Sequence, residues 1–169
     1  MIALAVALPY AFHSVGVPGT VALPMHLPVL LMGLLFGPAW GGAVGLLAPG
    51  LNTALTGMPP LAPPIMQLMT FELAVYGIAA GWARRHWRWG RLQSLAFALV
   101  AGRAALYLAA LLWGARLGLP MSPEAYLKSA VTAGWPGIAF QLIALPLLAK
   151  RLERLAGGEA EAGAFESGR

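Results

Sequence analysis

The stretch LPMHLPVLLMGLLFGPAWGGAVGLLAPGLNTALT, residues 23–56, decides the fold because it contains no Asp, Glu, Lys or Arg. It lies inside a longer uncharged run from Met1 to Phe71, and the whole chain of 169 residues is 59% hydrophobic and only 10% charged. Ordinary soluble domains carry about 25% charged residues, and a soluble core of this size could not bury so long an uncharged run. The sequence therefore excludes a globular cytosolic enzyme and indicates an integral membrane protein.

Proline and glycine divide this apolar sequence into segments of the length that a membrane helix needs, about 20 residues each. The sequence predicts an all-α bundle of six transmembrane helices over residues 1–155. A disordered cytoplasmic tail, residues 156–169, is expected to follow, because its Gly, Ala, Glu and Ser cannot bury enough surface to fold. The predicted helices span residues 2–15, 22–36, 39–55, 65–83, 92–115 and 126–149, with a proline-rich loop over 56–64.

Basic residues cluster between the fourth and fifth predicted helices and again after the sixth. Six crossings place both clusters on one side of the membrane, which the positive-inside rule makes cytoplasmic. We therefore expect both termini to be cytoplasmic in a multi-pass protein of the cell membrane, and the net charge of +5 to reflect topology and not a nucleic-acid partner. The clusters consist of Arg84, Arg85, Arg88 and Arg91, and of Lys150, Arg151 and Arg154.

Small residues recur four apart on several predicted helices, a spacing that lets helix backbones approach closely in lipid. Packing within one bundle explains most such stripes. The pair Ala3 and Ala7 has a second interpretation, a face that docks onto another membrane protein. The other stripes are Gly37, Gly41 and Gly45, and Gly77 and Gly81.

Glu72 and Arg103 are ionisable residues near the middle of two predicted helices that are antiparallel neighbours. Each alone would cost about 2.5–3.5 kcal/mol at the centre of a membrane helix. The sequence therefore predicts an intramembrane ion pair. The pair either fixes the register of the two helices or lines a substrate cavity.

Polar residues gather at the predicted outer end of the bundle, and apolar walls with a few converging polar groups are typical of a small-molecule pocket. Two neutral imidazoles could ligate the iron of a haem or the cobalt of a corrinoid, with a methionine as a softer ligand. A zinc site has no visible third ligand, no catalytic motif occurs, and no resident cofactor or metal is expected. The predicted substrate-binding residues are His13, His26, Met25, Asn52, Met58 and Gln67.

The order of these features resembles the substrate-binding S components of energy-coupling factor (ECF) transporters. The segments that carry the resemblance are LPYAFH (residues 8–13), PVLLMGLLFGP (28–38), LTGMPP (55–60) and FELAVYG (71–77). The resemblance implies a six-helix bundle that binds a vitamin or similar micronutrient, with loops 15–23 and 57–64 covering it. It also implies a transmembrane T component, docked on Ala3 and Ala7, and two cytosolic ATPases on other chains.

The cargo and the class of function stay open at this point, because proteins that share a fold bind different molecules. His13 and His26 with their neighbouring methionines favour a metallotetrapyrrole, haem ahead of cobalamin. An uncharged or anionic vitamin held by His13, His26, Asn52 and Gln67 is the competing hypothesis. A structural or assembly subunit of a membrane complex is the alternative from a different functional class.

Overall fold

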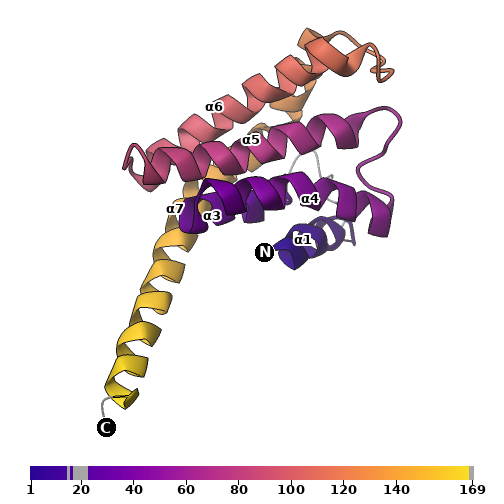
Figure 1. The fold of residues 1–169 in the computed structure, drawn as a ribbon. Coiled ribbons are helices and arrows are strands. Elements are labelled where there is room, and N and C mark those ends of the chain that lie inside the picture. The colour runs from indigo at the N-terminus through magenta and orange to yellow at the C-terminus, as the bar shows by residue number, and fades with distance from the viewer. Residues whose placement is uncertain (15, 17–22, 168–169) are drawn as a thin grey trace.

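The computed structural model describes residues 1–14, 16 and 23–167, except for the side chains of residues 13, 14 and 156–167. Throughout this part of the chain the regular elements are helices and no strand occurs, which confirms the predicted all-α class. Figure 1 shows the arrangement of the helices. They are α1 (Ile2–Ser14), α3 (His26–Phe36), α4 (Pro38–Thr56), α5 (Ile65–Arg85), α6 (Arg91–Ala109), the short π-helix η1 (Ala110–Gly114) that continues α6, and α7 (Pro123–Ser167).

The start of α3 corrects one predicted boundary. The sequence predicted a helix over 22–36, whereas α3 begins at His26. Leu23 has a φ of 48°, in the left-handed region, which a right-handed helix cannot accommodate. The turn that follows Leu23 carries the chain through Pro24 and Met25 into α3.

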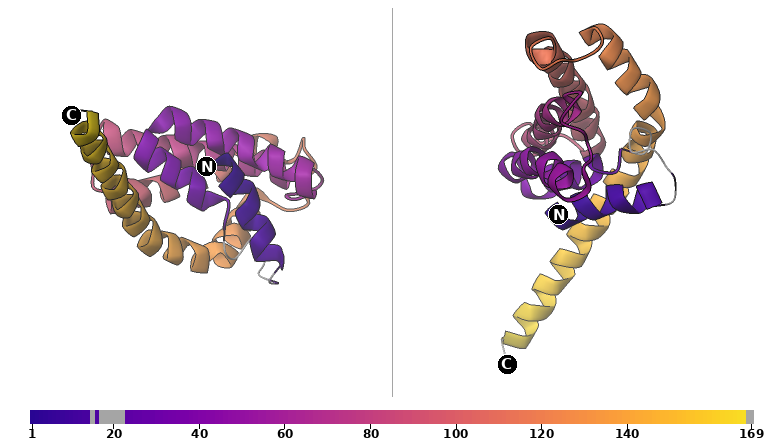
Figure 2. Two further views of the ribbon diagram at one scale, coloured as in Figure 1. Left: turned by 90° about the horizontal axis from the view of Figure 1, so that it is seen from below. Right: turned by 90° about the vertical axis from the view of Figure 1, so that its right-hand side faces the viewer.

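Helix α7 is longer than the predicted helix over 126–149 at both ends. It begins at Pro123, because the fixed φ of proline suits the first turn of a helix. It continues to Ser167 through the segment for which a disordered tail was expected, where Ala and Glu favour a helix by intrinsic propensity. The division of the chain at residue 155 stays a prediction. Figure 2 shows that the last part of α7 extends away from the other helices.

The centre of the bundle is formed by α4, α5 and α6, which lie side by side (Figure 1), with α3 packed against α4 and α5. Helices α1 and α7 pack around this centre. The main core is apolar and draws on α1, α3, α4, α5, α6 and α7. Its fully buried side chains include Val29, Leu30, Ala48, Leu73, Tyr76, Leu95 and Leu145. A smaller apolar cluster around Leu68 and Leu106 lies between α5, α6, η1 and α7.

Close packing of α4 on α5 depends on glycine. A Cβ atom added at Gly41 would lie 2.5 Å from the carbonyl oxygen of Gly77 and 2.7 Å from the Cα of Gly33. Helices α3, α4 and α5 therefore contact one another through their backbones at Gly33, Gly41 and Gly77. The predicted packing role of the glycine stripes is confirmed here, since small residues replace hydrophobic attraction as the means of helix association in lipid.

The outer surface of the bundle is apolar, as a bilayer requires. Large hydrophobic side chains such as Val100 and Ile143 are about 70% exposed, at 71% and 68%. By length and composition, three helical segments in the described part of the chain can cross a membrane: 65–85, 91–114 and 123–155. Helices α1 and α3 are apolar but shorter, and the 11 residues of α3 rise only about 16 Å.

The two basic clusters lie at the same end of the bundle. Arg84, in the last turn of α5, is 3.8 Å from a carboxylate oxygen of Glu153 on α7, and Arg91, at the start of α6, pairs with the same carboxylate. Trp82, Trp87 and Trp89 are exposed around this end, as expected of an interfacial aromatic belt.

Candidate functional site

A cavity of about 480 Å³ lies between the helices at the opposite end of the bundle. Its walls come from the first half of α5, the second half of α6, the starts of α3 and α7, and single residues of α1 and α4. Loop 57–64 closes a further side. Along α5, the distance from the cavity residue Met69 to Arg84 in the basic cluster is about 20 Å at 1.5 Å per residue. The cavity and the basic cluster therefore lie at opposite ends of α5.

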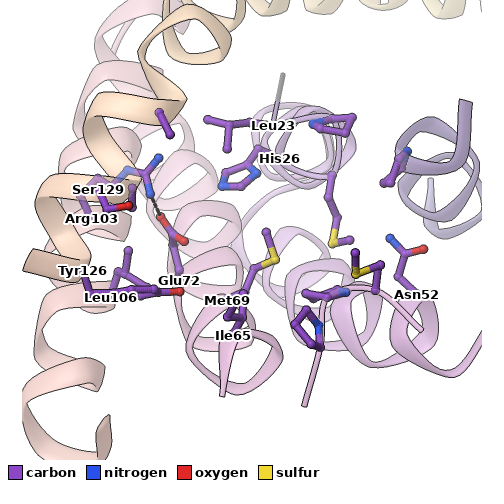
Figure 3. A pocket seen from close by; sticks show the side chains of 18 of the residues that line it. Leu23, His26, Asn52, Ile65, Met69, Glu72, Arg103, Leu106, Tyr126 and Ser129 are labelled. Atoms are coloured by element: carbon purple, nitrogen blue, oxygen red, sulfur yellow. Dashed lines mark hydrogen bonds and ion pairs between the residues drawn. The ribbon is translucent and has the colours of Figure 1, made fainter. Parts of the chain in front are cut away.

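The helices reach the cavity through regular spacings. On α5, Ile65, Met69 and Glu72 line it at i, i+4 and i+7, which is one face of a helix. On α7, Tyr126 and Ser129 line it three residues apart. Figure 3 shows these side chains converging on one space, with Met69 between the two ends of the cavity.

Glu72 and Arg103 form the predicted ion pair, and both line the cavity. Arg103 Nη1 donates a hydrogen bond of 2.6 Å to Glu72 Oε1, and the two side chains are 13% and 5% exposed for Arg103 and Glu72 respectively. Within the described residues, Arg103 Nε and Nη2 have no hydrogen-bond partner. The pair thus joins α5 to α6 and also supplies the charged part of the cavity wall.

His26 is the first residue of α3 and is 1% exposed. Its ring packs edge-on against Tyr76, with 5.2 Å between the ring centroids and 63° between the ring planes. In the part of the chain that the structure describes, neither ring nitrogen has a hydrogen-bond partner. Buried polar groups in proteins are nearly always hydrogen-bonded, so an imidazole in this state at a cavity wall is a candidate ligand-binding group.

Asn52 forms the polar wall on the side of the cavity away from Glu72 (Figure 3). It is 2% exposed, and its Oδ1 lacks a partner among the described side chains and backbone. The neighbouring loop is held to the same helix, since Thr53 Oγ1 donates a hydrogen bond of 2.6 Å to the carbonyl of Pro59. Met58 and Pro59 are thereby positioned over the cavity.

The structure brings together most of the predicted substrate-binding residues. Met25, His26, Asn52 and Met58 all line the cavity. Gln67 does not line it: its side-chain Nε2 donates a hydrogen bond of 3.3 Å to the carbonyl of Leu61 and so helps to hold loop 57–64. Gln67 lies two residues from Ile65 and Met69 on α5, which turns it off the cavity face. The side chain of His13 and most of loop 15–23 lie outside the described residues.

Sequence reasoning missed the contribution of α7 and of the turn before α3. Tyr126 and Ser129 line the cavity, as does Leu23. Leu23 is fixed from α7, because Gln141 Nε2 donates a hydrogen bond of 3.4 Å to its carbonyl. The helical spacing from Glu72 could have indicated that Met69 and Ile65 face the same cavity. Nothing in the sequence around Ser129 indicates in a comparable way that it lines the wall.

Ala3 and Ala7 lie outside the cavity. Both are exposed on α1 and line a shallow apolar groove between α1 and the end of α4, together with Tyr10 and Leu51. The interior of the bundle is contacted instead by Ala5, which is fully buried. The small pair is therefore available to a partner, and its predicted docking role stays a prediction.

One comparison with known proteins matches this chain. The family model of the ECF transporter, substrate-specific component, matches residues 1–149. No curated protein and no solved structure matches the chain. The matched region contains every residue that lines the cavity and each described helix up to residue 149, which lies within α7. The chain therefore belongs to the family of substrate-specific components of ECF transporters, which are membrane transport subunits and not enzymes.

Proposed function

We propose that this chain captures a vitamin-sized micronutrient from outside the cell in the cavity described above. The observation that carries the proposal is that five of the ten buried polar atoms without partners in the described structure, on His26, Asn52 and Arg103, belong to residues that line one cavity. The cavity volume of about 480 Å³ falls within the range of about 300–1,000 Å³ of small-molecule sites. A bound molecule would satisfy these atoms.

The proposed topology is a multi-pass protein of the cell membrane with six crossings and both termini in the cytoplasm. The shared location of the basic clusters, through Arg84, Arg91 and Glu153, supports it. The short helices α1 and α3 then cross as part of the bundle, with loops at their outer ends.

ECF substrate-specific components work with a T component and ATPases. For this chain we propose a transmembrane T component and two cytosolic ATPases, since the sequence holds no phosphate-binding loop of its own. The exposed face of Ala3 and Ala7 is the proposed docking site for the T component, because small residues let a partner helix approach closely.

A haem is the metal-containing candidate for the cargo, and His26 supports it. In the described residues, no three His, Asp or Glu side chains form a metal site, so iron would arrive within a porphyrin and bind one ring nitrogen of His26. Met25 and Met58 would pack against the ring or offer a thioether. Cobalamin is bulkier and fits a cavity of this size less well. A vitamin without metal, hydrogen-bonded to His26 and Asn52, is the other candidate.

An absorbance spectrum and a native mass spectrum of the detergent-purified chain, before and after addition of haem, test the proposal. A Soret band that shifts in His26→Ala would support haem as the cargo. A co-purified organic molecule without a Soret band would contradict haem and support the capture of another micronutrient. A chain that carries no molecule and takes up none would contradict the proposed function and favour an assembly subunit.

A further inference from the structure

The cavity carries charges that cancel. Of the side chains that line it, Glu72 and Arg103 are the two charged ones among the described residues, and they are bonded to each other at 2.6 Å. The remaining polar wall consists of His26, Asn52, Tyr126 and Ser129, whose side chains are ordinarily uncharged at neutral pH, or mostly so in the case of histidine. The other parts of the wall are apolar.

A cavity of this kind selects against a charged molecule. A charge that leaves water for a buried site needs an opposite charge there, because its hydration is lost. Here the acidic and the basic group already neutralise each other, so an anion or a cation would leave the occupied site with an uncompensated charge. A molecule without net charge, a zwitterion included, leaves the balance intact.

The unpartnered polar atoms describe the hydrogen-bonding pattern of such a molecule. Asn52 Oδ1 accepts hydrogen bonds, Arg103 Nε and Nη2 donate them, and a neutral imidazole at His26 does one of each. Figure 3 places Asn52 on one side and Glu72 and Arg103 on the other. The matching molecule therefore needs a hydrogen-bond donor at the end near Asn52 and an acceptor at the end near Arg103.

The space between these two ends is lined by thioethers. Met69 lies there (Figure 3), and Met25 and Met58 also belong to the wall. Methionine sulfur packs favourably against aromatic rings, and its flexible side chain adapts to flat shapes. The middle of the cavity thus favours an aromatic ring system over a hydrated or aliphatic chain.

We propose that the cargo is an aromatic heterocycle without net charge at neutral pH that carries hydrogen-bonding groups at both ends. This inference rests on the proposed capture of a micronutrient and narrows it to one class. It favours the vitamin without metal over haem, whose two propionates are negatively charged.

The wild-type chain gives the first test. The molecule that co-purifies with it is released by denaturation, and its mass and formula give its charge at pH 7. In parallel, thermal-shift assays and equilibrium dialysis compare two matched pairs of probes: riboflavin with riboflavin 5′-phosphate, and nicotinamide with nicotinate. We expect a co-purified molecule without net charge, or binding of the uncharged probe at least tenfold tighter than its anionic counterpart.

A charge-removing variant gives the second test. Glu72→Gln leaves Arg103 without its counter-ion, so the preference should move at least tenfold towards the anionic member of a pair. The matched control is Glu153→Gln, which makes the same chemical change in the ion pairs at the basic end of the bundle. It should leave the preference between the two probes unchanged. The wild-type comparison stands by itself if Glu72→Gln fails to fold.

The outcomes separate the two proposals. A charged co-purified molecule, uptake of haem, or tighter binding of the anionic probes by the wild-type chain would overturn the inference and leave the proposed function in place. A chain that carries no molecule and binds none of the probes would contradict the proposed function, and the inference would fall with it.

Discussion

Replacing one partner of the ion pair between Glu72 and Arg103 should destabilise the bundle far more than replacing both partners together. The substitutions are Glu72→Leu, Arg103→Leu and the double variant. With 2.6 Å between Arg103 Nη1 and Glu72 Oε1, the charge centres lie about 4 Å apart, where the attraction is about 4 kcal/mol at an effective dielectric constant of about 20. Each single variant loses this attraction and leaves one charge buried at a site that is at most 13% exposed.

The expected cost of each single substitution is about 3–5 kcal/mol in the free energy of unfolding. The double variant removes both charges and both desolvation penalties, so it should cost less than either single variant. The difference appears as a coupling energy of at least about 2 kcal/mol in a double-mutant cycle. Equal and additive losses, with the double variant the least stable, would refute the reasoning.

The assay is reversible unfolding of the purified chain in mixed micelles, followed by far-ultraviolet circular dichroism. Glu153→Leu is the control for removal of an ionic carboxylate. Its side chain is 37% exposed and pairs with Arg84 and Arg91 near the surface, where such pairs contribute about 0–1 kcal/mol. If Glu153→Leu lowered the free energy of unfolding as much as Glu72→Leu does, burial of the ion pair would not determine the cost of removing its carboxylate.

Three further outcomes follow from the packing and the cavity. Gly41→Ala places a Cβ 2.5 Å from a carbonyl oxygen of α5 and should lower the free energy of unfolding by about 1–3 kcal/mol, measured by thermal unfolding. Gly50→Ala, where a Cβ would have no neighbour within 4 Å, should be neutral or slightly stabilising. Equal effects of the two substitutions would contradict the packing role of Gly41. His26→Ala should abolish binding of the co-purified molecule while the helical content is retained, and His86→Ala at the exposed basic end should bind normally; loss of binding in both would argue against a specific role for His26. Ala7→Leu should weaken co-purification with the proposed T component and leave small-molecule binding intact, and unchanged assembly would contradict the proposed docking role of Ala7.

The ion pair is the part of the site that the sequence predicted best. An unpaired charge is costly in a bilayer. Because Glu72 and Arg103 lie at similar depths on neighbouring antiparallel helices, each was the expected partner of the other. The same reasoning located the polar residues His26 and Asn52 near one end. Each was recognisable because polar groups are rare in this sequence and need partners.

The faces of the helices were harder to predict than their positions. In a membrane protein the lipid-facing and the interior faces are both apolar, so hydrophobic periodicity does not show which side of α5 or α7 turns inward. Gln67 was therefore assigned to the cavity although it supports loop 57–64, and Ser129 was overlooked although it lines the wall. The start of α3 depends on the backbone of Leu23, which Gln141 holds from α7, and no local signal marks so distant a contact.

The cancelled charges of Glu72 and Arg103 also affect how the cavity responds to the membrane potential. An unpaired charge that crosses a potential of 100 mV gains or loses about 2.3 kcal/mol. The bonded pair has no net charge, and an uncharged cargo adds none. Moving this occupied cavity across the bilayer would do no electrical work, so the affinity for the cargo would be the same in energised and depolarised cells.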